Sequence, residues 1–356
     1  QTVEEIVIPS TVASIGNKAF FGCSNLKSLI FTETPEGQTP VDLVILDTPN
    51  GSSNNGYTNS PFYGCTSLKN IVLPERLTVI GRLAFGGLVS GRYGEKYIPP
   101  FESISLPSTL KEIHEMAFLN ARNLKTVTFA SGTTLSDACD GKAFAIGKQA
   151  FYYCTSLTEI ALPTSSEATY SIGDTAFAYT GLKEISIPKA VGWLGSGVFN
   201  RSSDLAKAVF EAGANPKCGT SLFAYTAVSG VTLPEGVEAI SNYMFQGCVN
   251  LTSVTVPASV KSIGISAFES CQALAKVTFA TYEKDGKSYS NLISIDNYAF
   301  SKTGITSFTF PTLEGTKTLD LGNSLFRSCM KLETVGLSES VAEIGTAFAD
   351  CFSIRS

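Results

Sequence analysis

The chain has 356 residues, of which 44% are apolar and 16% are charged, and its net charge at pH 7 is −5. A charge this small leaves no electrostatic footprint for nucleic acid or for an anionic membrane, so neither is an expected partner. No run of about 18 apolar residues occurs, so we expect no segment of this chain to insert directly into a membrane.

The chain enters a repeated pattern within its first residues, where the apolar run Ile6 to Ile8 is followed by Pro9. No signal peptide precedes this run, so we expect a trimmed or mature fragment. Thirteen phenylalanines set the register of the pattern, and they are 22 to 24 residues apart where nothing is inserted. This period is within the range of leucine-rich repeats and predicts a solenoid. The thirteen are Phe20, Phe62, Phe85, Phe118, Phe151, Phe177, Phe199, Phe223, Phe245, Phe268, Phe300, Phe326 and Phe348.

Each repeat contains three stretches, which residues 251–271 illustrate. Leu251 to Val256 alternates apolar with small polar residues, which predicts a strand with one buried face. Pro257 ends the pairing of that strand, because proline has no N–H to donate. Val260 to Gly264 predicts a second short extended piece. Ala267 to Cys271 predicts a tight turn or a single helical turn that brings the chain back.

A single coil of this kind cannot fold alone. It buries one Phe, one Leu and about four Ile or Val side chains, each worth roughly 1.5–3 kcal/mol. Ordering about 22 residues costs about 1–2 kcal/mol for each residue's backbone. The total cost exceeds the free energy gained by burying these side chains. Stacked coils fold because the apolar side chains of each coil are buried against those of its neighbours. We therefore predict one domain, residues 1–356, that is an α/β-type solenoid, mostly β, of about 13 stacked coils with short strands and turns.

Seven of the nine cysteines share one position of the repeat, three residues after the phenylalanine. Other coils place Thr180, Leu88 or Ala121 there, so the position is used for packing, and free cysteine behaves as a small buried hydrophobe. We predict buried, unpaired thiols in this column. Cys139 and Cys218 lie outside it, and the pattern leaves their state open. The seven are Cys23, Cys65, Cys154, Cys248, Cys271, Cys329 and Cys351.

The repeats resemble the BspA-type leucine-rich repeats. The resemblance lies in Ile-Gly-x-x-Ala-Phe, as at Ile172 to Phe177 and Ile263 to Phe268, and in the continuation Cys-x-x-Leu-x-x-Ile-x-Leu-Pro, as at Cys65 to Pro74. It covers the chain from Val3 to Ile354. The family implies a right-handed superhelix on a bacterial or protist cell surface, often one that attaches to host proteins or to other cells. It implies no catalytic residues.

The outward face of the first strand is the first candidate for recognition, because it varies on a regular frame. It is small and rich in hydroxyl groups, as at Ser103, Thr126 and Thr255, which also simply suits an exposed parallel sheet. It lacks the Trp, Tyr and Arg that dominate binding hot spots. The charged positions on this face that we expect to contact a partner are Glu159, Glu184, Lys207 and Lys276.

The insertions are the second candidate, near residues 32–59, 88–99, 130–147 and 280–291. Most enter just past the first strand and are expected to line one edge, either as tolerated surface loops or hairpins or as contacts for a partner. Two of them combine tyrosine with basic residues, namely Tyr93 and Tyr97, and Tyr282 and Tyr289. In the longest insertion, Val41 to Leu46 predicts a strand that extends the sheet or caps the N-terminal end.

Catalytic chemistry is not indicated. The single histidine, His114, lies in half of a His-Glu-x-x-His pattern, has no second histidine, and occupies the glycine position of the repeat, which favours a surface turn. Trp193 is alone and is expected in a repeat core position. We expect no enzyme activity, no catalytic or metal-binding residue and no cofactor.

Two functions remain open. The first is a cell-surface or secreted adhesion module that binds a host or bacterial macromolecule, such as a matrix or surface protein, through its strand face and insertion edge. The second is a glycan-binding or structural spacer module of a surface protein. The expected location in both is extracellular or at the cell surface.

Overall fold

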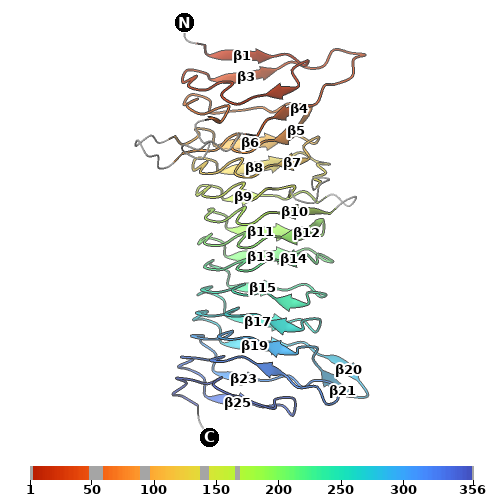
Figure 1. Ribbon diagram of the computed structural model, residues 1–356, viewed down its shortest axis with the longest axis vertical. Coiled ribbons are helices and arrows are strands. Elements are labelled where there is room, and N and C mark those ends of the chain that lie inside the picture. Colours follow the sequence, from red (N-terminus) through yellow and green to blue (C-terminus); the bar gives the residue numbers. More distant parts are fainter. Residues whose placement is uncertain (1–2, 48–58, 89–96, 137–143, 165–168, 355–356) are drawn as a thin grey trace. The chain divides into compact units, whose positions relative to one another are not determined.

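The computed structural model describes residues 3–47, 59–88, 97–136, 144–164 and 169–354. Within these ranges the chain consists of short strands and turns, so the expected solenoid is built of β-structure without helices (Figure 1). No membrane-crossing helix is therefore found in the described part of the chain. The coils form two compact units, residues 1–198 and 199–356, with six of the thirteen repeat phenylalanines in the first unit and seven in the second.

In the first unit most coils contribute two short strands, which pair in parallel with the equivalent strands of neighbouring coils. The first strands are β1 (Glu5–Ile8) with β3 (Ser28–Phe31), then β6 (Ser103–Leu106) with β8 (Thr126–Phe129) and β9 (Glu159–Ile160), and β11 (Glu184–Ile187). The second strands are β2 (Ser14–Ile15), β4 (Leu43–Ile45), β5 (Leu77–Ile80) and β7 (Glu112–Ile113) in one sheet, and β10 (Tyr170–Ile172) with β12 (Val191–Leu194).

The second unit repeats this arrangement. Its first strands are β13 (Lys207–Phe210), β15 (Gly230–Thr232), β17 (Ser253–Val256) and β19 (Lys276–Phe279) in one sheet, and β23 (Ser307–Thr309) with β25 (Thr334–Gly336). Its second strands are β14 (Lys217–Cys218), and a sheet of β16 (Ala239–Ile240), β18 (Ser262–Ile263), β22 (Ser294–Ile295) and β24 (Asp320–Leu321). An antiparallel hairpin, β20 (Tyr282–Lys284) with β21 (Lys287–Tyr289), follows β19.

The repeat phenylalanines form a stack of parallel rings inside each unit. Neighbouring ring centroids are 4.8 Å apart at Phe118 and Phe151 and 5.4 Å apart at Phe245 and Phe268, with interplanar angles of 4° and 10°. The turn that carries each ring is tied to the next coil by the backbone, as where Phe118 N–H donates to the carbonyl of Ala150 at 2.7 Å. The third stretch of the repeat is thus a tight turn and not a helical one.

Glycine follows the second strand in many coils because the backbones approach closely there. A Cβ atom on Gly173 would lie 2.6 Å from the Lys148 nitrogen, and one on Gly81 would lie 2.3 Å from the Ile45 carbonyl oxygen. Both distances are shorter than van der Waals contact, so this position of the repeat needs a residue without a side chain.

The seven cysteines of the column are all unpaired, as predicted, and five of them are buried, whereas Cys23 and Cys351 are half-buried. The structure adds a reason for the choice of residue. Cys248 Sγ donates to the Phe223 carbonyl at 3.0 Å, and Cys271 Sγ donates to the Phe245 carbonyl at 3.1 Å. Coils with threonine satisfy the carbonyl of their own phenylalanine, as Thr226 Oγ1 does for Phe223 at 2.8 Å. Both cysteine and threonine suit this position because each fills a small space and donates one hydrogen bond. Cys139 lies outside the described residues, and Cys218 is free and half-buried.

One prediction about a single segment is confirmed, and one about a single residue is wrong. The predicted strand at Val41 to Leu46 is β4, which joins the sheet between β2 and β5 as the second strand of its coil and does not cap an end. Trp193 does not lie in the core. Its exposed fraction is 39%, because Val191 and Leu194 take the inward positions of β12.

The thiol column leads to a prediction about reactivity. Burial raises the pKa of Cys248 to about 11 and that of Cys65 to about 12, so these thiols stay protonated at neutral pH and react slowly. We expect native protein to release little chromophore from a disulfide reagent at pH 8 over minutes, and denatured protein to show at least seven free thiols at once. A native protein that reacts as fast as the denatured one would contradict the buried column.

Candidate functional site

The four charged residues predicted on the outer strand face are all exposed. Glu159 in β9 and Glu184 in β11 belong to the first unit, and Lys207 in β13 and Lys276 in β19 belong to the second. In the second unit the register pairs Lys207 with Gly230, Gly230 with Ser253 and Ser253 with Lys276, so the two lysines stand in one column. The structure thus places the two glutamates on successive coils of the first unit, and the two lysines in one column of the second unit with Gly230 and Ser253 between them.

The two tyrosines of the hairpin face each other across its strands. The ring centroids of Tyr282 and Tyr289 are 6.1 Å apart, and both rings are half-buried. Tyr282 Oη donates to Glu314 Oε2 at 3.1 Å, and Lys284 forms an ion pair with the same carboxylate. Glu314 belongs to the insertion of the next coil, so this edge of the solenoid is a braced protrusion.

Tyr97 has a different role from the one expected. Its exposed fraction is 7%, its hydroxyl donates to the Phe62 carbonyl at 2.9 Å, and its ring centroid lies 4.8 Å from that of Tyr63. Its backbone forms an antiparallel bridge with Leu88, which closes the base of the insertion. Tyr97 therefore packs the loop onto the coils and is not available to a partner. Tyr93 lies outside the described residues.

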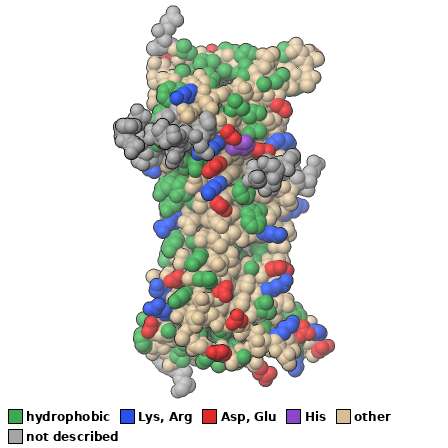
Figure 2. Space-filling model, viewed as in Figure 1, with side chains coloured by type: hydrophobic (Ala, Val, Ile, Leu, Met, Phe, Trp, Pro, Cys, Tyr) green, Lys and Arg blue, Asp and Glu red, His purple; other side chains and the backbone are tan. Residues whose placement is uncertain are grey.

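His114 lies in a cluster of charged side chains and not in a simple surface turn. Its Nδ1 is 2.7 Å from Asp47 Oδ1 and its Nε2 is 2.9 Å from Glu112 Oε2, so both ring nitrogens face carboxylates. Figure 2 shows this single histidine among acidic and basic side chains. Asp47 also accepts the Arg82 N–H at 2.6 Å. No group of three or more metal-ligating residues occurs in the described part of the chain.

The cluster acts as a clamp between coils. Asp47, Arg82 and His114 come from three successive coils, and they line a cavity of about 380 Å³. No nucleophilic side chain is found within hydrogen-bond reach of either histidine nitrogen in the described chain. The arrangement can hold a proton between carboxylates, and it offers no acyl-transfer constellation.

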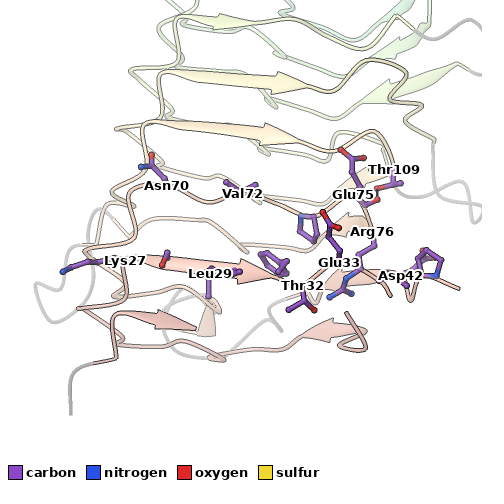
Figure 3. Close-up of a pocket in the computed structure, with 16 residues that line it drawn as sticks. Lys27, Leu29, Thr32, Glu33, Asp42, Asn70, Val72, Glu75, Arg76 and Thr109 are labelled. Atoms are coloured by element: carbon purple, nitrogen blue, oxygen red, sulfur yellow. Dashed lines mark hydrogen bonds between the residues drawn. The ribbon is translucent and has the colours of Figure 1, made fainter. Parts of the chain in front are cut away.

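A larger groove, of about 1060 Å³, lies in the first unit between β3 and residues 70–74 of the next coil. Figure 3 shows Lys27 and Asn70 at one end of this groove and Glu33 and Glu75 toward the other, with Val72 between them. Sequence reasoning did not identify this site.

The groove coincides with a gap in the first-strand ladder. β3 pairs with β1, and no backbone hydrogen bond joins it to residues 69–74. The same two coils are joined elsewhere, through the Phe20 N–H to the Pro61 carbonyl at 2.9 Å and through the pairing of β4 with β5. The coils are therefore held together on two sides and are open on the third.

The outer face beside this gap is apolar, unlike the hydroxyl-rich face of later coils. Val7, Ile30 and Val72 occupy one outward position in three successive coils and are 52%, 43% and 78% exposed. Ser105 and Thr128 take the same position in the next two coils. A signal was present in the sequence, because these coils carry three large apolar residues in a row. Ile160 to Leu162 and Ala208 to Phe210 are also apolar throughout, but each contains an alanine.

Arg76 lies beside the groove and fastens three coils. Its guanidinium donates from Nη1 to the carbonyls of Val12 at 2.5 Å and Val41 at 3.2 Å, and from Nη2 to that of Pro9 at 3.0 Å. The side chain is only 7% exposed, and its Nε has no hydrogen-bond partner. Arginine suits this role because its planar group donates in several directions at once.

Stacked parallel coils of this period, with inward Leu, Ile and Phe, place the chain among the leucine-rich repeat solenoid proteins. The BspA type leucine-rich repeat region matches in six copies, over residues 1–39, 45–92, 96–144, 139–250 and 238–356. These matches cover nearly the whole chain, so it belongs to the BspA-type leucine-rich repeat family.

Several solved structures are similar at low identity. A leucine-rich repeat protein from Bacteroides ovatus is 24% identical with a TM-score of 0.49, over 99% of this chain and 85% of that one. A leucine-rich cell surface protein from Faecalibacterium prausnitzii is 22% identical with a TM-score of 0.42, over 99% and 78%. The pneumococcal vaccine antigen PcpA is 15% identical with a TM-score of 0.39, over 76% and 72%. No curated protein sequence matches. The family assignment rests on the repeats.

The His114 clamp predicts a pH-dependent stability. The hydrogen bond between His114 and Asp47 raises the pKa of the histidine above 6.5 and lowers the pKa of the aspartate below 3.8. The contribution of the histidine to the free energy of unfolding is complete below its unfolded pKa of 6.5 and disappears as the pH rises through the folded value. The contribution of the aspartate is lost on acidification. We expect His114→Gln to lower the free energy of unfolding by about 1 kcal/mol at pH 5.5 and by much less at pH 9.

Urea unfolding at the two pH values measures this difference. Asp47→Asn is the matched variant, and the double variant is expected to lose little more at pH 5.5 than either single one. An equal loss at both pH values would mean that the histidine acts through packing and not through its charge.

Arg76 predicts a large loss of stability when its donors are removed. Arg76→Met keeps the aliphatic stem. Among the described residues it leaves the Val12 and Val41 carbonyls without a donor, while the Pro9 carbonyl keeps the Val12 N–H, so we expect a loss of about 3 kcal/mol. Lys125→Met removes an exposed cation that pairs with Glu102, and is expected to cost less than about 1 kcal/mol. Chemical unfolding compares the two, and similar small losses would show that the Arg76 bonds contribute little.

Proposed function

We propose that this chain is a non-catalytic protein-binding module of a cell-surface or secreted protein, and that it attaches to a host or bacterial macromolecule. The observation that carries the proposal is the long uncovered strand face. The Phe, Cys and Leu side chains point inward and stack the coils, while the outward positions of the first strands stay exposed in both units. A repeat frame of this kind presents an extended surface and not an enclosed pocket.

We propose that a partner contacts the charged side chains on the strand face of each unit and the hairpin of the second unit. Glu159 and Glu184 give the first unit an acidic patch, and Lys207 and Lys276 give the second a basic column. Tyr282 and Tyr289 add aromatic surface on the braced hairpin, and aromatic residues are enriched where proteins bind each other. Membership of the BspA-type family supports the same role, since it brings a repeat scaffold without a set of catalytic residues.

An array of extracellular matrix proteins and glycans tests the proposal. We expect the immobilised chain to bind at least one matrix or surface protein, and Lys207→Glu with Lys276→Glu, or Glu159→Lys with Glu184→Lys, to weaken that binding at least fivefold. Lys217→Glu on β14 is the control, because it reverses an exposed charge on a second strand. Binding to glycans and to no protein would favour the glycan-binding alternative, and binding to neither class would contradict both.

A further inference from the structure

We propose that the groove between β3 and residues 70–74 binds an extended peptide segment as an added parallel β-strand. The segment would carry aliphatic side chains at alternate positions and end in a basic residue. This inference rests on the proposed protein-binding function and deepens it, since it names the site and the kind of segment that the partner supplies.

The first observation is a strand edge with free backbone groups. Ser28 N–H donates to the Glu4 carbonyl at 3.3 Å, and Thr32 N–H donates to the Ile8 carbonyl at 3.0 Å. These bonds show that the even-numbered residues of β3 direct their backbone groups toward β1. The backbone groups of Leu29 and Phe31 therefore point away from β1, toward the next coil. No backbone hydrogen bond from the described residues meets them there. An edge of this kind is the template on which extended peptides add to a sheet.

The partner edge across the groove is equally open. In the regular coils the residue before the strand donates to the preceding coil, as Lys125 N–H does to the Glu102 carbonyl at 2.7 Å. Its counterpart Lys69 donates instead to Ser67, at 3.0 Å within its own coil. Val72 bridges to Ser105 on the far side, so the first-strand ladder resumes only beyond the groove.

The second observation is the apolar wall. Ile30 and Val72 flank the gap with exposed aliphatic side chains, and Phe31, Pro40 and Pro74 complete the lining. Apolar surface beside unpaired backbone groups suits a segment that brings both hydrogen bonds and aliphatic side chains. A sugar or a charged polymer would leave the aliphatic surface exposed to water.

The third observation is the charge along the groove, which places the basic residue of the segment. Lys27 and Asn70 lie at the end where β3 begins, and Glu33, Asp42 and Glu75 lie at the end where it finishes (Figure 3). The Arg76 guanidinium nearby already donates to three carbonyls. A segment parallel to β3 has its C-terminal end beside the carboxylates, so a lysine or arginine is expected there.

Fluorescence anisotropy with a designed peptide tests this inference. The probe is a labelled nine-residue peptide whose core alternates threonine with valine and whose last two residues are lysine. We expect saturable binding. A second peptide with the same side chains, but with methyl groups on alternate backbone nitrogens, is expected to bind at least tenfold more weakly, because it has lost the donors that pair with the strand edge.

Matched substitutions locate the site on the protein. Ile30→Thr combined with Val72→Thr gives these coils the hydroxyl face that Thr128 and Thr255 give others, so the fold is retained, as circular dichroism would verify. We expect at least tenfold weaker peptide binding. Val209→Thr changes an equally exposed valine in β13, where the ladder with β15 is closed, and is expected to change nothing.

Three results would overturn the inference, namely no binding of the probe, equal binding of the methylated peptide, or equal loss on Val209→Thr. None of them affects the proposed function, which the protein and glycan array tests independently. A matrix protein that binds the Ile30→Thr and Val72→Thr variant as tightly as the native chain would leave the protein-binding role intact and exclude the groove as its site.

Discussion

The stacking of buried phenylalanine rings is the interaction on which the rest of the structure depends. The centroids of neighbouring rings lie about as far apart as neighbouring strands in a β-sheet. One distance between coils therefore suits both the ring stack and the hydrogen-bonded strands beside it. That shared distance explains why a thiol or hydroxyl three residues later meets a phenylalanine carbonyl, and why glycine is needed where two backbones touch. Each coil is stable only as a neighbour of another coil.

The beginning of the first unit shows what happens when one ladder departs from this spacing. Between β3 and residues 70–74 the ring stack and the second-strand sheet continue, and the first-strand ladder stops. Arg76 reaches across the same coils and replaces part of the missing backbone pairing with side-chain hydrogen bonds. The gap is therefore a local opening in which polar backbone groups and aliphatic side chains are exposed together. The first-strand ladder is also interrupted between β19 and β23.

Most of the solenoid could be predicted from the sequence, because a residue type that recurs thirteen times at one repeat position indicates that this position has the same environment in every coil. The phenylalanine register, the strand positions and the free cysteine column were all confirmed. The errors concern residues that occur once. Tyr97 is buried by its hydrogen bond to Phe62, and Trp193 is exposed by the local inward pattern of β12, and neither depends on a period. The open ladder at Leu29 depends on pairing between coils, which no stretch of sequence encodes alone.

The thiol column has a consequence for how long such a protein survives in an oxidising medium. The five buried thiols of the column are kept from oxidants by the coils that cover them, namely Cys65, Cys154, Cys248, Cys271 and Cys329. Once a stretch of coils opens in an oxidising medium, exposed thiols form disulfides that the native stack has no place for, and the opening becomes irreversible. The working lifetime is then set by the rate at which coils open.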